Sequence, residues 1–206
     1  MTALIAFAGL PSSGKSSAAR ALGDILKTEV MLEPEENSWP DLVHDREKVG
    51  YFTALTWFRS VRVPQLYRAD ELKRNGQIAI IDSYYDVLVS QYLRKPSFSW
   101  LIPLADPYFP VAEAMAKSDW VNLPKADILV FLRIQEATWG KFIAKRGRQF
   151  DQTAGLLQGF QMQAELEAAC QMAADSHGTR LVICDQTNSS PEDTANLIAQ
   201  RIRAYL

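Results

Sequence analysis

The sequence comprises 206 residues, of which 48% are apolar and 22% charged, and its 22 basic and 24 acidic side chains give a net charge of −2. This is ordinary globular composition, and the length suits a single domain over residues 1–206 with a large core. The charge balance argues against a general nucleic-acid binder, which would normally be basic.

Two further features bear on where the protein works. Cys170 and Cys184 are too few for a disulfide framework or a zinc site, so we expect two core thiols and a reducing compartment. A predicted strand starts at once without a charged leader, and no apolar run approaches the ~20 residues of a membrane span. The sequence therefore predicts a cytoplasmic protein that does not enter a membrane.

The first elements in chain order are a buried strand, predicted over residues 4–8, and an amphipathic helix, predicted over residues 16–26. Between them stands Gly9-Leu10-Pro11-Ser12-Ser13-Gly14-Lys15-Ser16, which matches the phosphate-binding pattern of Gly, four residues and Gly-Lys-Ser. Backbone N–H groups can turn toward an anion there, the Lys15 ammonium reaches the outer phosphates, and the Ser16 hydroxyl can ligate Mg²⁺. A small-residue turn that binds nothing is the alternative, which the flanking strand and helix disfavour. We therefore predict that this loop, with Ser17 after it, binds ATP and Mg²⁺.

Two later strands end in polar residues. A short strand predicted over residues 28–32 runs into Glu33, and a strand predicted over residues 77–81 runs into Asp82. Sites form at such strand ends in open parallel sheets.

Between and after these strands, two segments contain several prolines or aromatic residues. Helical periodicity extends from about residue 45 to residue 72, with Pro64 as a kink or break. Residues 95–110 hold four prolines among aromatic side chains, which excludes a regular helix. That segment could cover the site, form a contact in a homodimer or pack as a surface loop, and we favour the last.

The rest of the chain continues the alternation of strands and helices. The predicted elements are a strand over 127–132, a helix over 136–145, a helix from Thr153 to about 176, a strand over 180–184 and a helix from Pro191. With right-handed crossovers, this order predicts a three-layer α/β P-loop fold: about five parallel strands with helices on both faces.

Three polar groups besides the loop could meet at the carboxyl edge of that sheet. They are Glu33, Asp82 with Asp86, and the pair Arg146 and Arg148. Phosphoryl transfer needs such a set, because a carboxylate can take the proton of an acceptor hydroxyl while cations neutralise the phosphates. We expect Asp82 to bind Mg²⁺ through water. The alternatives are a solvated loop carboxylate at Glu33 and an ordinary charged helix end at the two arginines.

Taken together, these residues resemble the deoxynucleoside kinase family, with thymidylate kinases as more distant relatives, over most of the chain. The phosphate loop matches, as does a strand that ends in Glu33-Pro34 with Trp39 a few residues on. The later arginine-rich stretch is similar to the lid of that family and predicts a lid around residues 145–153.

The resemblance implies individual roles. Glu33 would bind the acceptor and act as the base that activates a sugar 5′-hydroxyl. The catalytic and ATP-binding cations would be Lys15, Arg146 and Arg148. The other acceptor contacts would be Trp39, Arg62, Asp86 and Asp151, with Arg62 and Asp86 recognising the base.

Two departures from the family pattern affect these expectations. Ser83 stands where the family usually has an arginine, so either another cation replaces it or turnover is impaired. Leu55 stands where a base-recognising Gln is expected, and an aliphatic side chain cannot make a two-point hydrogen bond. The acceptor could therefore be an atypical nucleoside, or a different kind of molecule.

The leading hypothesis is an ATP- and Mg²⁺-dependent kinase that phosphorylates a hydroxyl of a small acceptor, with a nucleoside 5′-hydroxyl favoured. A thymidylate-type nucleoside monophosphate kinase is one alternative, which the missing arginine after Asp82 disfavours. A nucleotide-binding sensor without turnover is the other.

Overall fold

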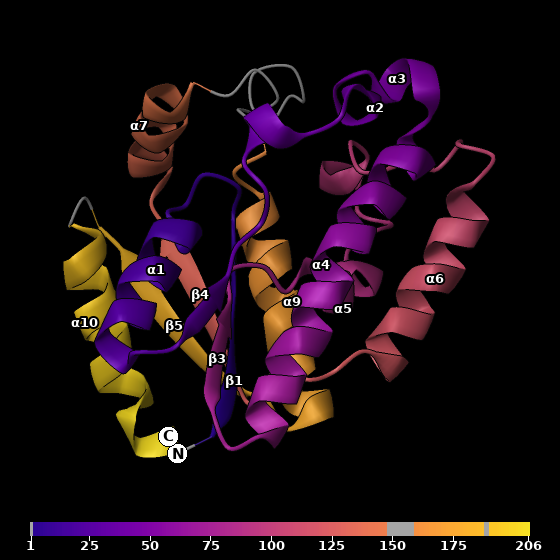
Figure 1. The fold of residues 1–206 in the computed structure, drawn as a ribbon. Coiled ribbons are helices and arrows are strands. Elements are labelled where there is room, and N and C mark those ends of the chain that lie inside the picture. The colour runs from indigo at the N-terminus through magenta and orange to yellow at the C-terminus, as the bar shows by residue number, and fades with distance from the viewer. Residues whose placement is uncertain (1, 148–158, 188–189) are drawn as a thin grey trace.

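One parallel sheet of five strands forms the centre of the protein (Figure 1). The computed structural model describes residues 2–147, 159–187 and 190–206. The strands are β1 (Ala3–Gly9), β2 (Glu29–Met31), β3 (Ile78–Ile81), β4 (Ile128–Ile134) and β5 (Arg180–Gln186). Their order is β2-β3-β1-β4-β5, and every neighbouring pair is parallel. The predicted α/β class is confirmed.

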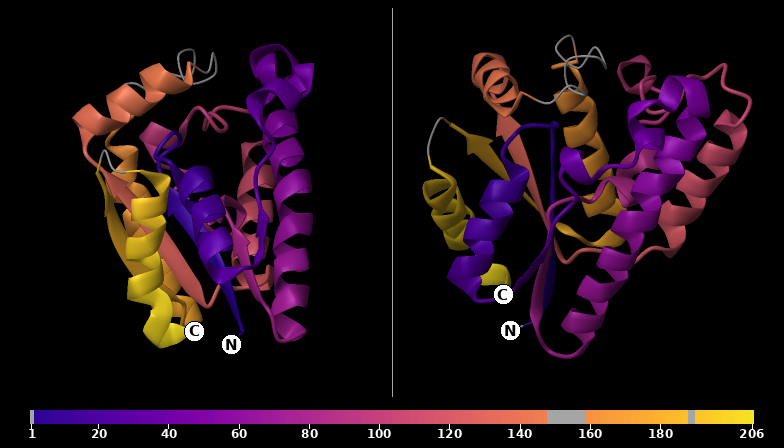
Figure 2. Two further views of the ribbon diagram at one scale, coloured as in Figure 1. Left: turned by 60° about the vertical axis from the view of Figure 1, so that its left-hand side comes forward. Right: turned by 45° about the horizontal axis from the view of Figure 1, so that its top comes forward.

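Different helices cover the two faces of the sheet (Figures 1 and 2). One face packs against α1 (Lys15–Leu26) and α10 (Pro191–Ile202), and the other against α4 (Tyr51–Arg74) and α9 (Met162–His177), with α5 (Tyr85–Leu88) and α6 (Phe109–Asn122) beside them. Successive side chains of a strand point to opposite faces. Accordingly Ile5 and Phe7 of β1 pack on the α1 side, whereas Leu4 and Ala6 pack on the α4 side.

The remaining elements are short or lie at the rim of the sheet. They are α2 (Asp41–His44), α3 (Arg46–Val49), α7 (Glu136–Arg146) and the 3₁₀ turns η1 (Glu36–Ser38), η2 (Val89–Gln91), η3 (Pro96–Phe98) and η5 (Arg203–Tyr205). Among the described residues, no helix is both long and apolar enough to cross a bilayer.

The helices differ from prediction in three places. The helix expected from about residue 45 to residue 72 is interrupted at Gly50, between α3 and α4, whereas Pro64 lies inside α4. The sequence patterns did not indicate α6, whose first turn contains Pro110. The helix expected from Thr153 is not continuous, because residues 160 and 161 form a turn and α9 begins at Met162; its predicted start lies outside the described residues.

The carboxyl ends of the strands gather the predicted site residues at one edge. β1 lies between β3 and β4, so the chain connections leave in opposite directions on its two sides. Ligands bind at such a reversal point in open α/β sheets. The loop after β1 and the residues after β2 and β3 all lie there.

Candidate active site

The phosphate loop joins β1 to α1 in a backbone conformation that requires glycine. Gly9 has φ +144°, and a Cβ added to it would lie 2.7 Å from the Leu132 carbonyl oxygen. Gly14 has φ +90° and precedes the first residue of α1. Lys15 folds back over the loop, where its Nζ donates to the carbonyls of Gly9 at 3.2 Å and Leu10 at 2.8 Å. The structure thus presents a helix N-terminus and an ammonium group at one point, as a phosphate site requires.

Two aromatic side chains that the sequence analysis missed anchor the loop from outside. The Tyr85 hydroxyl donates to the Gly9 carbonyl at 2.7 Å, and the Trp139 indole N–H donates to the Pro11 carbonyl at 2.7 Å. Tyr85 also lies beneath Lys15, whose Nζ is 5.3 Å from the ring centroid. Aromatic residues after strands are common in cores, so no sequence signal distinguished these two.

The predicted magnesium ligands are adjacent. The Ser16 hydroxyl donates to Asp82 Oδ2 at 2.7 Å, and the Glu33 backbone N–H donates to Asp82 Oδ1 at 2.9 Å. Burial, and then repulsion from Glu33, raise the pKa of Asp82. A bound cation would relieve that repulsion, and a hydroxyl with a carboxylate is the oxygen donor set that Mg²⁺ prefers. These residues therefore fit a magnesium ion.

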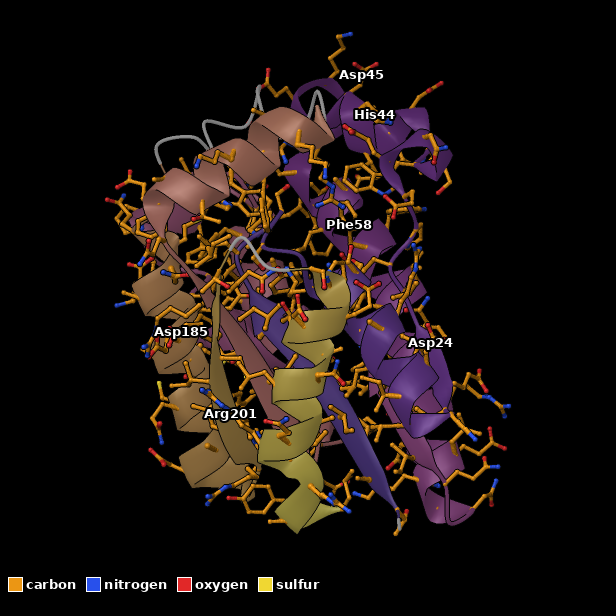
Figure 3. All side chains as sticks on the ribbon, turned by 90° about the vertical axis from the view of Figure 1, so that its left-hand side faces the viewer. Asp24, His44, Asp45, Phe58, Asp185 and Arg201 are labelled. Carbon is orange, nitrogen blue, oxygen red and sulfur yellow. The ribbon has the colours of Figure 1, made fainter. Side chains whose placement is uncertain are left out.

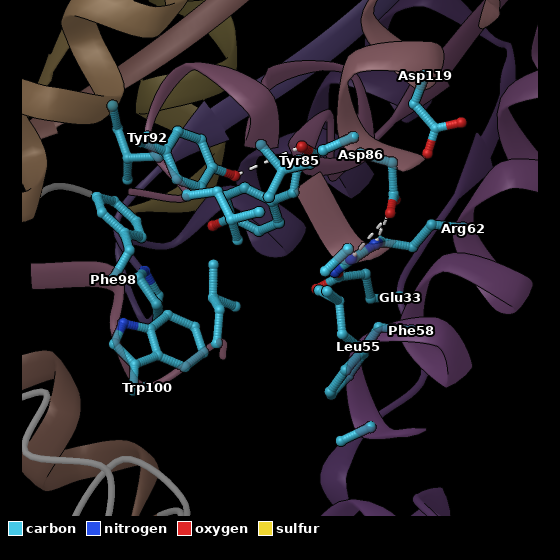
Figure 4. A pocket seen from close by; sticks show the side chains of 18 of the residues that line it. Glu33, Leu55, Phe58, Arg62, Tyr85, Asp86, Tyr92, Phe98, Trp100 and Asp119 are labelled. Atoms are coloured by element: carbon cyan, nitrogen blue, oxygen red, sulfur yellow. Dashed lines mark hydrogen bonds and ion pairs between the residues drawn. The ribbon is translucent and has the colours of Figure 1, made fainter. Parts of the chain in front are cut away.

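Arg62 of α4 joins the two candidate acceptor-site carboxylates (Figure 4). Its Nε and Nη2 donate to Asp86 at 2.6 and 3.2 Å, and its Nη1 donates to Glu33 Oε1 at 3.0 Å. Burial alone would raise the pKa of Glu33, but attraction to Arg62 and then to Lys15 outweighs it and lowers that pKa. Glu33 is consequently ionised at neutral pH, as a proton acceptor must be. The predicted Arg62 and Asp86 pair does form, whereas its contact with Glu33 was not predicted.

Arg146 approaches the loop from the end of α7. Its Nη1 donates to the Ser12 hydroxyl at 3.2 Å, and its Nη2 lies 3.9 Å from Glu35 Oε2. Gly147 follows in the left-handed conformation and ends the helix. Arg146 therefore stands beside the phosphate site, as predicted. Arg148 and Asp151 lie outside the described residues.

A pocket of about 130 Å³ extends from the phosphate loop to the space between α4 and α6. Glu33, Arg62 and Trp39 line it, as does Leu55 from the first turns of α4. The segment before α6 contributes Trp100, so that segment packs into the protein and also forms a wall of the pocket.

The two cysteines and the two histidines are not among the residues that line the pocket, and the cysteines are core thiols, as expected. Cys170 and Cys184 are both buried free thiols. His44 is exposed at the outer end of α2, where its ring lies 5.9 Å from that of Trp39 (Figure 3). The His177 ring lies 4.2 Å from that of Trp120, tilted by 46°, away from the pocket.

Comparison with known proteins identifies the fold. No protein-family model and no curated protein sequence matches the chain. Deoxyadenosine kinase from M. mycoides with bound dATP is similar in structure, with a TM-score of 0.70 and 20% identity over 97% of this chain and 99% of that one. Thymidylate kinase from Candida albicans has a TM-score of 0.67 and 18% identity over 99% of this chain and 92% of that one. The chain therefore has the P-loop fold found in these two kinases.

Proposed function

We propose that the protein is an ATP-dependent phosphotransferase that moves the γ-phosphate of ATP to a hydroxyl of a small acceptor. The observation that carries this proposal is the contact between Arg62 Nη1 and Glu33 Oε1, which are 3.0 Å apart. This carboxylate and this cation line the same pocket as the phosphate loop. A loop that only bound nucleotide would not need an ionised carboxylate beside an open pocket.

The phosphate side of the reaction would be served by residues of three elements. Lys15 and the backbone N–H groups at the start of α1 would bind the β- and γ-phosphates. Ser16 and Asp82 would hold Mg²⁺, which when bound neutralises charge on those phosphates. Arg146 and Arg148 would stabilise the charge that spreads over the phosphoryl group in the transition state.

The acceptor side would use Glu33 as the base. Its carboxylate would accept the hydroxyl proton as the acceptor oxygen bonds to the γ-phosphorus and ADP leaves. Because Arg62 donates to both Glu33 and Asp86, it would hold Glu33 in place. Its charge would also compensate for the absence of an arginine at position 83, where Ser83 stands.

A nucleoside 5′-hydroxyl is the reference acceptor, because two of the solved structures of similar fold are described as deoxyadenosine kinase with bound dATP or dCTP. The arrangement offers less to a nucleoside monophosphate, because Arg62 is already bonded to two carboxylates and could not hold an acceptor phosphate without losing them.

Acceptor-dependent release of ADP tests the proposal. The purified protein, ATP and Mg²⁺ are incubated with nucleosides, nucleoside monophosphates and hydroxylated small molecules. We expect ADP release that rises with one acceptor class, together with a phosphorylated acceptor detected by mass spectrometry. ATP binding without acceptor-dependent release in any of them would favour a sensor instead.

A further inference from the structure

Ser83, just after β3, carries a buried hydroxyl that makes no hydrogen bond of ordinary geometry with a described residue. The residue is 9% exposed, and its Oγ lies out of contact with solvent. Buried hydroxyls are nearly always paired, because burial without a partner is unfavourable. The other such hydroxyl in the described part of the chain is that of Ser13, in the phosphate loop. Both therefore lie at the edge of the sheet that holds the candidate site.

The register of the sheet sets Ser83 beside Glu33. Met31 of β2 pairs with Ile81 of β3, and both side chains pack on the α4 face of the sheet. The Asp82 N–H donates to the Met31 carbonyl at 3.1 Å, so the pairing continues past the end of β3. Side chains alternate between the two faces. The residues two positions further on, Glu33 and Ser83, therefore lie level with each other on the α4 face.

Asp82 follows the same alternation on the opposite face. Its Oδ2 accepts from the Ser16 hydroxyl at 2.7 Å, and Ser16 belongs to α1, which covers that face. The alternation thus turns Asp82 toward the proposed metal site and Ser83 toward Glu33. Ser83 is not among the residues that line the pocket. Any effect of its hydroxyl on an acceptor therefore passes through a neighbouring side chain.

The Glu33 carboxylate can accept from a second donor. Arg62 Nη1 donates to one of its oxygens, Oε1, at 3.0 Å, whereas a carboxylate has about four acceptor positions. A single contact leaves the terminal torsion of a glutamate broad. Burial raises the pKa of Glu33, but attraction to Arg62, then to Lys15, and last the nearby Ser83 hydroxyl lower it. That hydroxyl is therefore close enough to favour the ionised carboxylate.

We propose that Ser83 is a positioning residue: its hydroxyl turns to donate to the Glu33 carboxylate and holds that carboxylate toward the acceptor hydroxyl. Arg62 contributes the charge, and Ser83 contributes a neutral second donor. The acceptor proton still passes to Glu33 as the acceptor oxygen bonds to the γ-phosphorus, and Ser83 neither gains nor loses a proton. This inference rests on the proposed function and adds to it a residue that acts through Glu33.

Steady-state kinetics of Ser83 variants test the inference. Ser83→Ala removes the donor, so kcat should fall by roughly tenfold while KM for ATP stays within about twofold of wild type. Ser83→Thr keeps a hydroxyl and should restore kcat to within about threefold of wild type. A wild-type kcat in Ser83→Ala would overturn the inference. So would a rise in KM for ATP without a fall in kcat, or no recovery of kcat in Ser83→Thr.

Thr179→Val is the matched control. Thr179 is 4% exposed, and its Oγ1 donates to the Ala126 carbonyl at 2.8 Å. Both residues precede strands, so they lie at the opposite edge of the sheet. The variant also removes a buried hydroxyl, so it should lower the midpoint of thermal unfolding while leaving kcat unchanged. An equal fall of kcat in Thr179→Val and Ser83→Ala would give Ser83 a structural role only and would overturn the inference.

Infrared spectroscopy decides the inference without turnover. The carboxylate band of Glu33 is obtained at neutral pH, with ADP and Mg²⁺ added, as the difference between each protein and its Glu33→Gln counterpart. The band should shift in Ser83→Ala and stay in place in Thr179→Val. Ser83→Cys, whose thiol is a weaker donor, should shift it in the same direction and replaces Ser83→Ala if that variant does not fold. An unchanged band would overturn the inference even in an active kinase. A shifted band would support it even if no acceptor were phosphorylated and the proposed function failed.

Discussion

Arg62 Nη1 lies 3.0 Å from Glu33 Oε1, although the two residues come from different layers of the fold. Glu33 follows an edge strand of the sheet, whereas Arg62 lies in the middle of a helix that covers the sheet. The guanidinium that contacts the candidate base therefore comes from α4, which covers the sheet, and not from the end of the third strand, where Ser83 stands.

The first prediction concerns this contact. Arg62→Gln removes a guanidinium from two carboxylates, and Asp86 would then be buried without its ionic partner. We expect a loss of about 3 kcal/mol in the free energy of unfolding, together with a fall in kcat. Urea unfolding and steady-state kinetics measure the two effects.

Arg59→Gln is the control for that variant, because it removes a similar bidentate pair, with Asp119, that does not contact Glu33. It leaves Asp119, whose side chain is 7% exposed, without its ionic partner, so it should lower stability by a similar amount. It should change kcat little. Equal kcat values for wild type and Arg62→Gln would contradict the assigned role of Arg62.

The second prediction concerns Lys15. In the proposed reaction its ammonium would act on charge that develops during transfer, so Lys15→Ala should reduce kcat by ~10³-fold or more while ATP binding weakens less. Arg20→Ala, an exposed change on the same helix, should have no effect. Normal turnover in a folded Lys15→Ala protein would show that the phosphate loop is wrongly assigned.

The third prediction separates binding from chemistry at Glu33. Glu33→Gln keeps the size of the side chain but cannot accept a proton, so kcat should fall by ~10²-fold or more while ATP affinity stays near that of wild type. Glu29→Gln, at the exposed start of β2, serves as the control. Unchanged kcat and KM in an active enzyme would identify Glu33 as an ordinary loop carboxylate.

The fourth prediction concerns the end of α7. Arg146→Ala removes the hydrogen bond to Ser12 and a cation beside the phosphates, so kcat should fall more than ATP affinity. Its neighbour Lys145 is exposed, and Lys145→Ala should retain wild-type rates.

Hydrogen exchange across residues 145–153, with and without nucleotide and acceptor, tests the proposed lid: unchanged protection would exclude it.

The fifth prediction concerns the stability of the loop. Gly9→Ala would bring a Cβ to 2.7 Å from the Leu132 carbonyl oxygen in a backbone conformation that favours glycine. We expect it to lower the free energy of unfolding by about 2 kcal/mol. Gly76 also has a positive φ, but a Cβ added to it would meet no atom within 4 Å. Gly76→Ala should therefore lower the free energy of unfolding less, and the difference between the two variants measures the effect of the clash. Similar midpoints of thermal unfolding for the two variants would argue against a close approach at Gly9.

The sequence predicted the features that depend on neighbouring residues. The phosphate loop is a local pattern, and the buried strands are apolar runs, so both could be recognised without the fold. Asp82 and Glu33 could be placed together because parallel strands end at one edge. Cytoplasmic location and a homodimer contact stay predictions.

Features that depend on packing between distant segments could not be predicted in the same way. The contact of Arg62 with Glu33 joins side chains 29 positions apart, and it depends on how α4 packs against β3. α6 escaped detection because its apolar residues face both directions: Ala112 and Ala116 are buried, whereas Val111 and Val121 are exposed. Without that helix, the end of the pocket between α4 and α6 could not be seen from the sequence.

Tyr85 belongs to both halves of the site. Its hydroxyl holds the Gly9 carbonyl of the phosphate loop, and its ring lines the acceptor pocket. A molecule that shifts this ring on entering the pocket would therefore also disturb a support of the loop, and the two proposed substrates would then be thermodynamically linked. By reciprocity, any factor by which the acceptor changes the affinity for ATP is the factor by which ATP changes the affinity for the acceptor. In the proposed reaction, one phenol ring would thus couple occupancy of the phosphate loop to occupancy of the pocket.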